Sequence, residues 1–169
     1  MSAPQPPGPE PPAATVTVAV RVSVPPAAAF AAFTAEIDRW WRRGPKYRHA
    51  GGALDAAIHI EPRAGGRIYE TWSDGGSARE FVLGTVRAWQ PGELLVYGWR
   101  NATFAPLEET EVEVTFAAAG NGTLVTVRHR GFEKLRKDHP ARHGLDDVAF
   151  ARSLGRWWGE QLSALRESV

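Results

Sequence analysis

The fold of this chain can be inferred from the stretch DDVAFARSLGRWWGEQLSALRESV, residues 146–169. At 100° per residue its apolar side chains gather on one side of a helix. The members of this stripe are Ala151, Leu154, Gly155, Trp158, Leu162, Leu165 and Val169, with Phe150 and Trp157 at one edge. Asp146 and Asp147 stand at the start, where the helix dipole favours acids. A helix of about 22 residues is ~33 Å long, so a large apolar surface must cover it.

Length and composition indicate one domain without cysteine chemistry. The 169 residues suit a single domain, and a hydrophobic share of 43% with seven Trp is ample for one core. A formal net charge of +1 argues against a nucleic-acid or membrane surface. The absence of Cys excludes disulfides and thiolate metal sites. Without a secretory signal or an apolar run of ~18 residues, we expect a soluble, cytoplasmic protein.

The N-terminal segment 1–13 is dominated by proline and contains little apolar material. Proline supplies no amide donor, and this composition is typical of a disordered or polyproline-like tail. We therefore expect one folded domain at residues 14–169, preceded by a dispensable tail.

Seven strands and two short helices are predicted before the long helix. Residues 15–21 alternate Val with Thr, Ala and Arg, which indicates a strand with one buried face. Pro25 and Pro26 end this strand and open a helix, and Thr34 is expected to cap a second one. The later strands are expected at 57–61, 67–72, 79–89, 94–100, 110–116 and 123–130, with a bulge at Gly84. Short turns between them predict an antiparallel meander.

These elements predict an α+β fold in which a twisted antiparallel sheet curls over the long helix and both apolar surfaces are buried. Val112, Val114 and Phe116 should face the core. The acids between them should pair with bases on strand 123–130, which stabilises the hairpin by roughly 0.2–1 kcal/mol per pair.

Residues 42–56 form the longest predicted loop, because Gly44-Pro45 and Gly51-Gly52 resist regular structure. We expect few apolar contacts in this loop, with Tyr47 and Leu54 as its anchors. Such a segment opens at low cost, so we predict a mobile gate in which Tyr47 closes over a bound ligand. A fixed loop would place the entrance beside Phe132 instead.

Several spaced motifs resemble the helix-grip superfamily of START and birch-pollen-allergen-like domains, also called SRPBCC. They are AFAAFT (29–34) with Trp40-Trp41, EPRAGGR (61–67), GTVRAWQPGELLVYGW (84–99), TLVTVRH (123–129) with Gly131-Phe132, and GRWWGEQL (155–162). The branch that the chain resembles contains the C-terminal domain of the activator of the ninety-kilodalton heat-shock protein's ATPase. The resemblance spans residues 15–168 and implies a seven-stranded antiparallel sheet curled around the C-terminal helix.

The resemblance also implies a cavity between sheet and helix, open near residues 42–56. Its candidate lining residues are Trp40, Trp41, Tyr47, Glu70, Trp72 (or Tyr69), Phe81, Tyr97, Trp99, His129, Phe132 and Trp158. Core packing is the alternative for each of them. The excess of Trp favours a pocket, because indole carries an N–H that fits a dry core poorly. The sequence does not decide which face of strands 79–89 and 94–100 lines the cavity.

Two polar residues are expected to point inward. His129 shares a strand face with Val125 and Val127, so it is a ligand-orienting group, a general base or a hydrogen-bonded core residue. Glu70 needs a partner if it is buried, and Arg79 and Arg87 are the candidates.

Metal and cofactor sites are not predicted. His59 and Glu61 share a face but lack a third ligand. His139 and His143 are four residues apart, but Pro140 and Gly144 disfavour the helix that such a pair would need.

Two basic clusters are expected to be solvated surface, with an acidic ligand headgroup or acidic partner as the alternative. They are Arg39, Arg42, Arg43, Lys46 and Arg48, and the bases from Arg128 to Arg142.

Three functions follow, in order of preference. The first is noncovalent binding of a small apolar or aromatic ligand in the cavity, without turnover. The second is a co-chaperone-like module that binds a larger protein, with a chaperone as the candidate partner. A cyclase or other enzyme is the third, since this fold carries many functions. A monomer and a homodimer are both compatible with the sequence.

Overall fold

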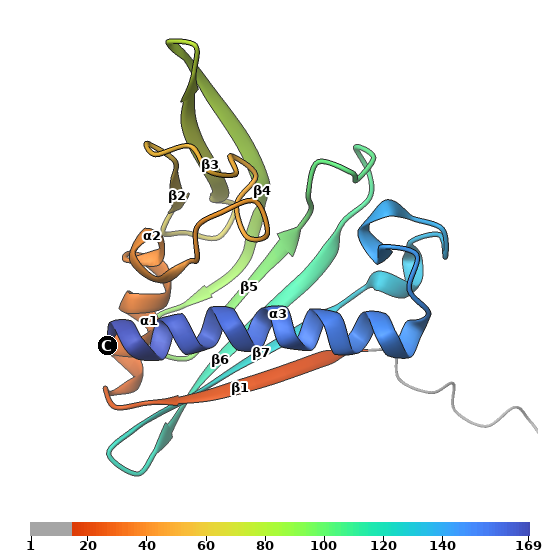
Figure 1. Cartoon of the computed structure of the whole chain (residues 1–169). Coiled ribbons are helices and arrows are strands. Elements are labelled where there is room, and N and C mark those ends of the chain that lie inside the picture. The colour runs from red at the N-terminus through yellow and green to blue at the C-terminus, as the bar shows by residue number, and fades with distance from the viewer. Residues whose placement is uncertain (1–14) are drawn as a thin grey trace, which may run out of the picture.

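The C-terminal helix α3 (Asp147–Ser168) lies across one face of a curved antiparallel sheet in the computed structural model (Figure 1). The structure describes residues 15–169, so the tail predicted at residues 1–13 lies outside the described residues. The strands are β1 (Val16–Val22), β2 (Ala57–Ile60), β3 (Arg67–Asp74), β4 (Ser77–Gln90), β5 (Leu94–Trp99), β6 (Thr110–Ala119) and β7 (Gly122–Arg130). The other helices are α1 (Pro26–Thr34) and α2 (Ile37–Trp40), with 3-10 turns η1 (Phe132–Lys134) and η2 (Pro140–Arg142).

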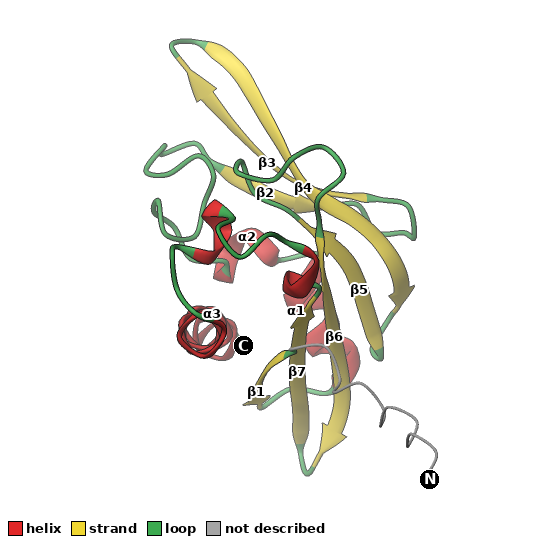
Figure 2. Cartoon of the chain, turned by 90° about the vertical axis from the view of Figure 1, so that its right-hand side faces the viewer, coloured by secondary structure: helices red, strands yellow, loops and turns green. Residues whose placement is uncertain are grey.

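The strand order β1-β7-β6-β5-β4-β3-β2 confirms the predicted meander, with β1 added beside β7. Every neighbouring pair is antiparallel. Figure 2 shows the three α-helices on the same side of the curved sheet. This is the α+β helix-grip fold that the sequence predicts, and it buries the apolar faces of sheet and helix together.

The predicted stripe of α3 forms the centre of the core. Asp146 caps the helix, since its Oδ1 accepts a hydrogen bond from the Ala149 amide at 2.8 Å. Trp158, Leu162 and Leu165 are at most 1% exposed. Val169, expected in the stripe, is exposed, because it follows the last helical residue.

Thr34 does not cap the second helix, and that prediction is wrong. Its Oγ1 donates a hydrogen bond back to the Phe30 carbonyl at 2.7 Å, one turn earlier in α1. A threonine inside a helix commonly bonds in this way. The residue before α2 is Glu36, which makes no side-chain capping bond.

The predicted cross-strand ion pairs are confirmed on the outer face of β6 and β7. Arg130 contacts Glu111 at 2.7 Å and Glu113 at 3.1 Å, and Arg128 contacts Glu113 at 3.3 Å. These side chains are between about a fifth and two fifths exposed, so each pair contributes little more than ~1 kcal/mol.

The irregularity predicted at Gly84 is present, and its cause is a close backbone approach. The register of β3 and β4 shifts between Ile68 and Tyr69, which pair with Gly84 and Val82. A Cβ atom added to Gly84 would lie 1.5 Å from the Gly98 carbonyl oxygen on β5. Only glycine therefore allows β4 to approach β5 this closely.

We expect Gly84→Ala to destabilise the protein by about 3 kcal/mol or more, because two backbones must separate to make room. Gly159→Ala is the matched control. A Cβ at Gly159 has no neighbour within 4 Å, so this helix substitution should stabilise by about 0.5–1 kcal/mol. Urea denaturation of both variants measures the difference, and equal midpoints would contradict the close approach.

Candidate functional site

Four tryptophan side chains from α3, β5 and the end of α2 meet between helix and sheet, and we call them the tryptophan cluster. Trp41 lies 5.7 Å from Trp99, 5.7 Å from Trp157 and 5.9 Å from Trp158, measured between ring centroids. Trp41 and Trp158 are buried, whereas Trp99 and Trp157 are partly exposed. The cluster therefore extends from the core to the surface.

His129 is joined to this cluster by a chain of hydrogen bonds that defines its tautomer. Trp158 Nε1 can only donate, so His129 Nδ1 accepts its bond at 3.1 Å. The neutral ring then carries its proton on Nε2 and donates to Thr110 Oγ1 at 2.8 Å, and Thr110 donates to the Trp99 carbonyl at 3.2 Å. Burial lowers the pKa of His129 to about 3.

This network favours one of the three interpretations of His129. Both ring nitrogens are occupied by protein groups, so neither is free to take a proton from a ligand. A neutral, fully bonded histidine at 1% exposure is a structural residue. It holds α3 against β5, β6 and β7.

Gln161 is a buried polar residue that the sequence interpretation missed. Its side chain is fully buried, and its Oε1 accepts a hydrogen bond from the Arg42 amide at 2.9 Å. That bond fixes the amide orientation, because a backbone N–H requires an acceptor. Its Nε2 has no hydrogen-bond partner. One feature of the sequence could have indicated that Gln161 points inward. It follows Trp158 by three residues and so lies on the same face of the helix.

Glu70 points inward as predicted, but neither predicted arginine is its partner. It is 1% exposed, and its Oε2 accepts a hydrogen bond from the Ala50 amide at 3.0 Å. Its Oε1 has no partner. Arg79 and Arg87 are exposed and lie beside other acids, Asp74 and Glu109 respectively. Burial raises the pKa of the Glu70 carboxyl, and the Ala50 hydrogen bond opposes this only in part.

The loop at residues 42–56 is bonded to α3 through its first half. Lys46 Nζ lies 2.7 Å from Glu160 Oε2, and the Tyr47 hydroxyl donates to the same oxygen. Trp157 Nε1 donates to the Lys46 carbonyl at 2.9 Å. Polar contacts thus join this half to α3, which the expectation of few apolar contacts did not include. Leu54 is fully exposed and anchors nothing. The mobility of the loop stays a prediction, and it now concerns the half that contains Leu54.

Two residues of the basic clusters are buried, so the expectation of a solvated surface is wrong for them. Arg48 is 3% exposed and contacts Asp38 at 2.8 Å. Arg142 is 5% exposed, contacts Asp147, and donates to the Phe132 carbonyl at 3.2 Å. A buried guanidinium is tolerated where an acid and carbonyl oxygens accept its protons.

The remaining predicted residues lie in three different surroundings. Trp40 and Tyr97 are core residues at 3% and 2% exposure. Phe132 belongs to a second apolar cluster with Phe104, Leu135, Ala141 and Phe150.

Trp72 and Phe81 are partly exposed and pack on His49, with ring centroids 5.4 and 4.0 Å from it. Tyr69, the alternative to Trp72, stacks on His59 at 4.9 Å. The structure thus brings Trp41, Tyr47, Trp99, His129 and Trp158 together, and leaves Trp72 and Phe81 in a separate group.

Two pockets of the described residues lie elsewhere. One of about 360 Å³ is lined by the loop at residues 43–56, and one of about 160 Å³ lies among Arg87, Glu111, Arg130 and their neighbours. None of the predicted lining residues borders either pocket. The cavity between sheet and helix therefore stays a prediction.

A family model described as "Activator of Hsp90 ATPase homolog 1-like protein" matches residues 23–157. This chain belongs to that family. The match confirms the resemblance found in the sequence, and it includes strands β2 to β7 and the first half of α3. None of the curated proteins matches the chain.

Solved structures of low sequence identity share the fold of this chain. A protein of Mesorhizobium loti has 22% identity and a TM-score of 0.59, with 91% of this chain and 95% of that chain covered. A protein of Cytophaga hutchinsonii has 15% identity and a TM-score of 0.63, with 91% and 92% covered. The Aha1 dimer from Colwellia psychrerythraea has 14% identity and a TM-score of 0.60, with 92% and 95% covered.

Neither a metal-binding cluster nor a membrane-crossing helix occurs among the described residues. Within residues 15–169, no three His, Asp or Glu side chains gather as a metal site. His59 bonds Thr71 at 3.0 Å, and His139 accepts from the Ala141 amide at 3.1 Å. Among the helices of the same residues, none combines the length and hydropathy needed to cross a bilayer.

Proposed function

We propose that this member of the family binds a small aromatic or apolar ligand at the tryptophan cluster, between the sheet and α3, without turnover. The unpaired Nε2 of Gln161 is the observation that carries the proposal. A buried donor without a partner costs about 1–3 kcal/mol, and a ligand oxygen would remove that cost. The ligand would therefore combine a flat apolar body with a hydrogen-bond acceptor such as a carbonyl.

The surroundings of Gln161 support this chemistry. Its Oε1 bonds the amide of Arg42, the residue directly after Trp41, and its own position lies one turn beyond Trp157 and Trp158. Indole rings offer flat apolar surfaces for stacking. Trp99 and Trp157 are partly exposed, so one side of the cluster is in contact with solvent.

The contacts at Glu160 would have to open for a ligand to enter. Lys46 and Tyr47 both bond this carboxylate from the loop. Lys46 is 57% and Glu160 39% exposed, so solvent screens their attraction. Opening of the loop at this point would also break the hydrogen bonds of Tyr47 to Glu160 and of Trp157 to the Lys46 carbonyl.

Binding without chemistry fits the titratable groups near the cluster. His129 is neutral and has both nitrogens bonded, and Glu70 is bonded to the loop amide of Ala50. An acid–base enzyme requires groups that converge on a reacting atom. A cyclase or other enzyme remains the third choice.

We expect Trp99→Ala to weaken ligand binding about tenfold, which corresponds to ~1.4 kcal/mol for a lost aromatic contact and its buried area. Displacement of anilinonaphthalene sulfonate by aromatic ketones measures the effect. Trp72→Ala is the matched control, because Trp72 is also partly exposed but packs on His49 outside the cluster. Equal loss in both variants, or none in either, would refute binding at the cluster.

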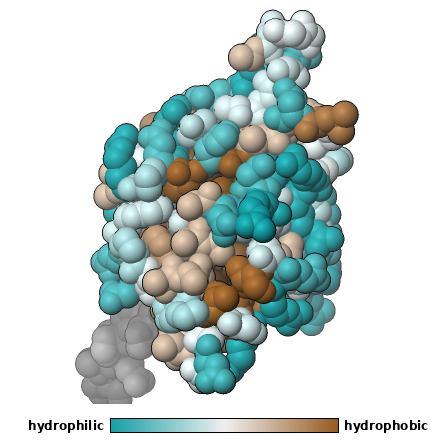
Figure 3. Space-filling model, turned by 90° about the vertical axis from the view of Figure 1, so that its left-hand side faces the viewer, coloured by the Kyte–Doolittle hydropathy of each residue, from teal (hydrophilic) through white to brown (hydrophobic). Residues whose placement is uncertain are grey.

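A protein-interaction module is the second candidate, and family membership together with an apolar surface favours it. The neighbour from Colwellia psychrerythraea is an Aha1 dimer. Figure 3 faces the side of α1, α2 and the end of α3, and apolar atoms gather across its centre. On α1 and just after it, the exposed residues include Ala27, Ala28, Ala31 and Ala35.

Two measurements separate the candidates. Sedimentation would distinguish a monomer from a homodimer, and native mass spectrometry would detect retained small molecules. If no compound in a panel of lipids and polyketides binds the protein, and the protein captures a chaperone, the results would favour the protein-interaction module.

A further inference from the structure

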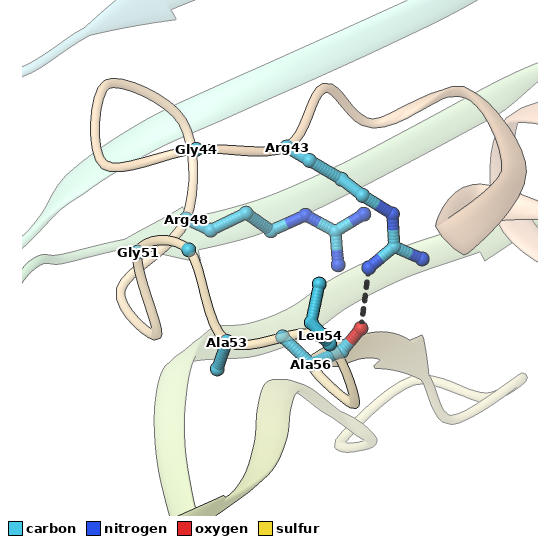
Figure 4. A pocket seen from close by; sticks show the side chains of 8 residues that line it. Arg43, Gly44, Arg48, Gly51, Ala53, Leu54 and Ala56 are labelled. Atoms are coloured by element: carbon cyan, nitrogen blue, oxygen red, sulfur yellow. Dashed lines mark hydrogen bonds between the residues drawn. The ribbon is translucent and has the colours of Figure 1, made fainter.

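The pocket of about 360 Å³ is built entirely from the loop that joins α2 to β2 (Figure 4). Its lining residues are Arg43, Gly44, Arg48, Gly51, Gly52, Ala53, Leu54 and Ala56. The tryptophan cluster contributes no residue to it. The pocket is therefore separate from the site of the proposed function.

Two guanidinium groups lie close together at one end of the pocket, those of Arg43 and Arg48 (Figure 4). Arg48 has a fully buried side chain and bonds Asp38 Oδ1 at 2.8 Å and the Trp41 carbonyl at 2.7 Å. Arg43 bonds Asp38 Oδ2 at 3.2 Å and the Ala56 carbonyl at 2.8 Å. Among residues 15–169, Asp38 is the one carboxylate bonded to either arginine. Two positive charges thus share one negative partner.

A second acid, Glu70 on β3, is bonded elsewhere. Its Oε2 accepts a hydrogen bond from the Ala50 amide at 3.0 Å, and it forms no ion pair with either arginine of the pocket. Asp38 is therefore the carboxylate that the two arginines share.

Arg43 has donors to spare for a ligand. A guanidinium carries five N–H groups, and the two bonds of Arg43 leave three of them unused. Its side chain is 55% exposed, so a solute reaches it directly. The planar fork matches the two oxygens of a carboxylate.

The rest of the pocket is small and apolar. Gly44 and Gly51 have φ of 99° and 62°, which glycine adopts at little cost, and neither adds a side chain to the space. Leu54 is fully exposed at the rim. An apolar group bound here would cover Leu54 and remove it from water.

We propose that this loop pocket binds a small monocarboxylate with a short apolar body. The carboxylate bonds Arg43, and the body lies against Leu54. A monocarboxylate adds one negative charge beside two arginines that share the single carboxylate of Asp38, whereas a phosphate dianion would add two.

Benzoate is the probe, with its neutral analogue benzamide as the ligand control. Backbone amide NMR shifts should move for Gly51, Gly52 and Ala53 and saturate with benzoate, while benzamide leaves them unchanged. Arg43→Gln should weaken benzoate about tenfold, the effect of a lost charge-assisted hydrogen bond. Leu54→Ser should weaken it about threefold.

Arg63→Gln is the matched control variant, because Arg63 is 64% exposed and also pairs with an acid, yet lies outside the pocket. It should bind benzoate like the parent protein. Unchanged affinity in Arg43→Gln, equal binding of benzamide, or shifts without saturation would each overturn the proposal. Shifts confined to Trp99 and Trp157 would also overturn it, and would support the tryptophan cluster instead, so the two proposals fail separately.

Discussion

Removal of residues 151–169 is expected to abolish folding. The deletion takes away Trp158, Leu162 and Leu165, each at most 1% exposed. Burial of such side chains contributes ~1.5–3 kcal/mol each, and the three together approach the 5–15 kcal/mol by which a typical domain is stable. The deletion also uncovers the apolar face of the sheet and leaves the Nδ1 of His129 without its donor. Circular dichroism should show no cooperative thermal transition.

The control for this deletion is a chain that lacks only Ser168 and Val169. Val169 is exposed, and the Ser168 hydroxyl donates to the Leu165 carbonyl in the last turn of α3, so this shorter deletion should change stability by less than about 1 kcal/mol. A chain ending at Phe150 that melts cooperatively near the parent temperature would show that α3 is not needed for the fold.

Acidification is expected to destabilise the protein through His129. Burial lowers the pKa of this group to about 3 in the folded protein, against about 6.5 in the unfolded chain. Above pH 6.5 both states are neutral and the group has no effect. As the pH falls from about 6.5 towards 3, only the unfolded chain binds the proton. The free energy of unfolding should therefore fall by about 1.4 kcal/mol per pH unit.

His129→Gln isolates this effect from the other titrating groups. Glutamine can still accept from Trp158 and donate to Thr110, but it does not titrate. Glu70 acts with the opposite sign, since burial raises the pKa of its carboxyl and stability from this group increases as the pH falls. Urea unfolding between pH 7 and 5 should give a steeper pH dependence for the parent than for the variant. Parallel curves would mean that His129 binds its proton in the folded state.

The predicted fold and the inward direction of individual side chains agree with the structure because periodicity is a local property. Alternation with a period of two places Val112 and Val114 on the inner face of β6 and His129 on the inner face of β7, and a period near 3.6 aligns Trp158 with Leu162 and Leu165. Gly84 could be predicted as an irregularity because a glycine inside a strand commonly marks a bulge or a close backbone approach. These features need no knowledge of distant partners.

The partners of polar groups are decided by residues far apart in the chain, and here the sequence was insufficient. Gln161 bonds the amide of Arg42 across 119 positions, and Glu160 meets Tyr47 across 113. Both contacts depend on the path of the loop over α3, which no periodicity encodes.

The helix-grip fold and the inward direction of Glu70 and His129 thus follow from the pattern of the sequence. The tertiary structure was needed to identify Ala50, and neither arginine, as the partner of Glu70. It also decided that Arg48 is buried, because loop 42–56 folds back over Asp38. The physical reason is that burial in a strand or helix follows from local periodicity, whereas the pairing of buried charges follows from how distant segments pack.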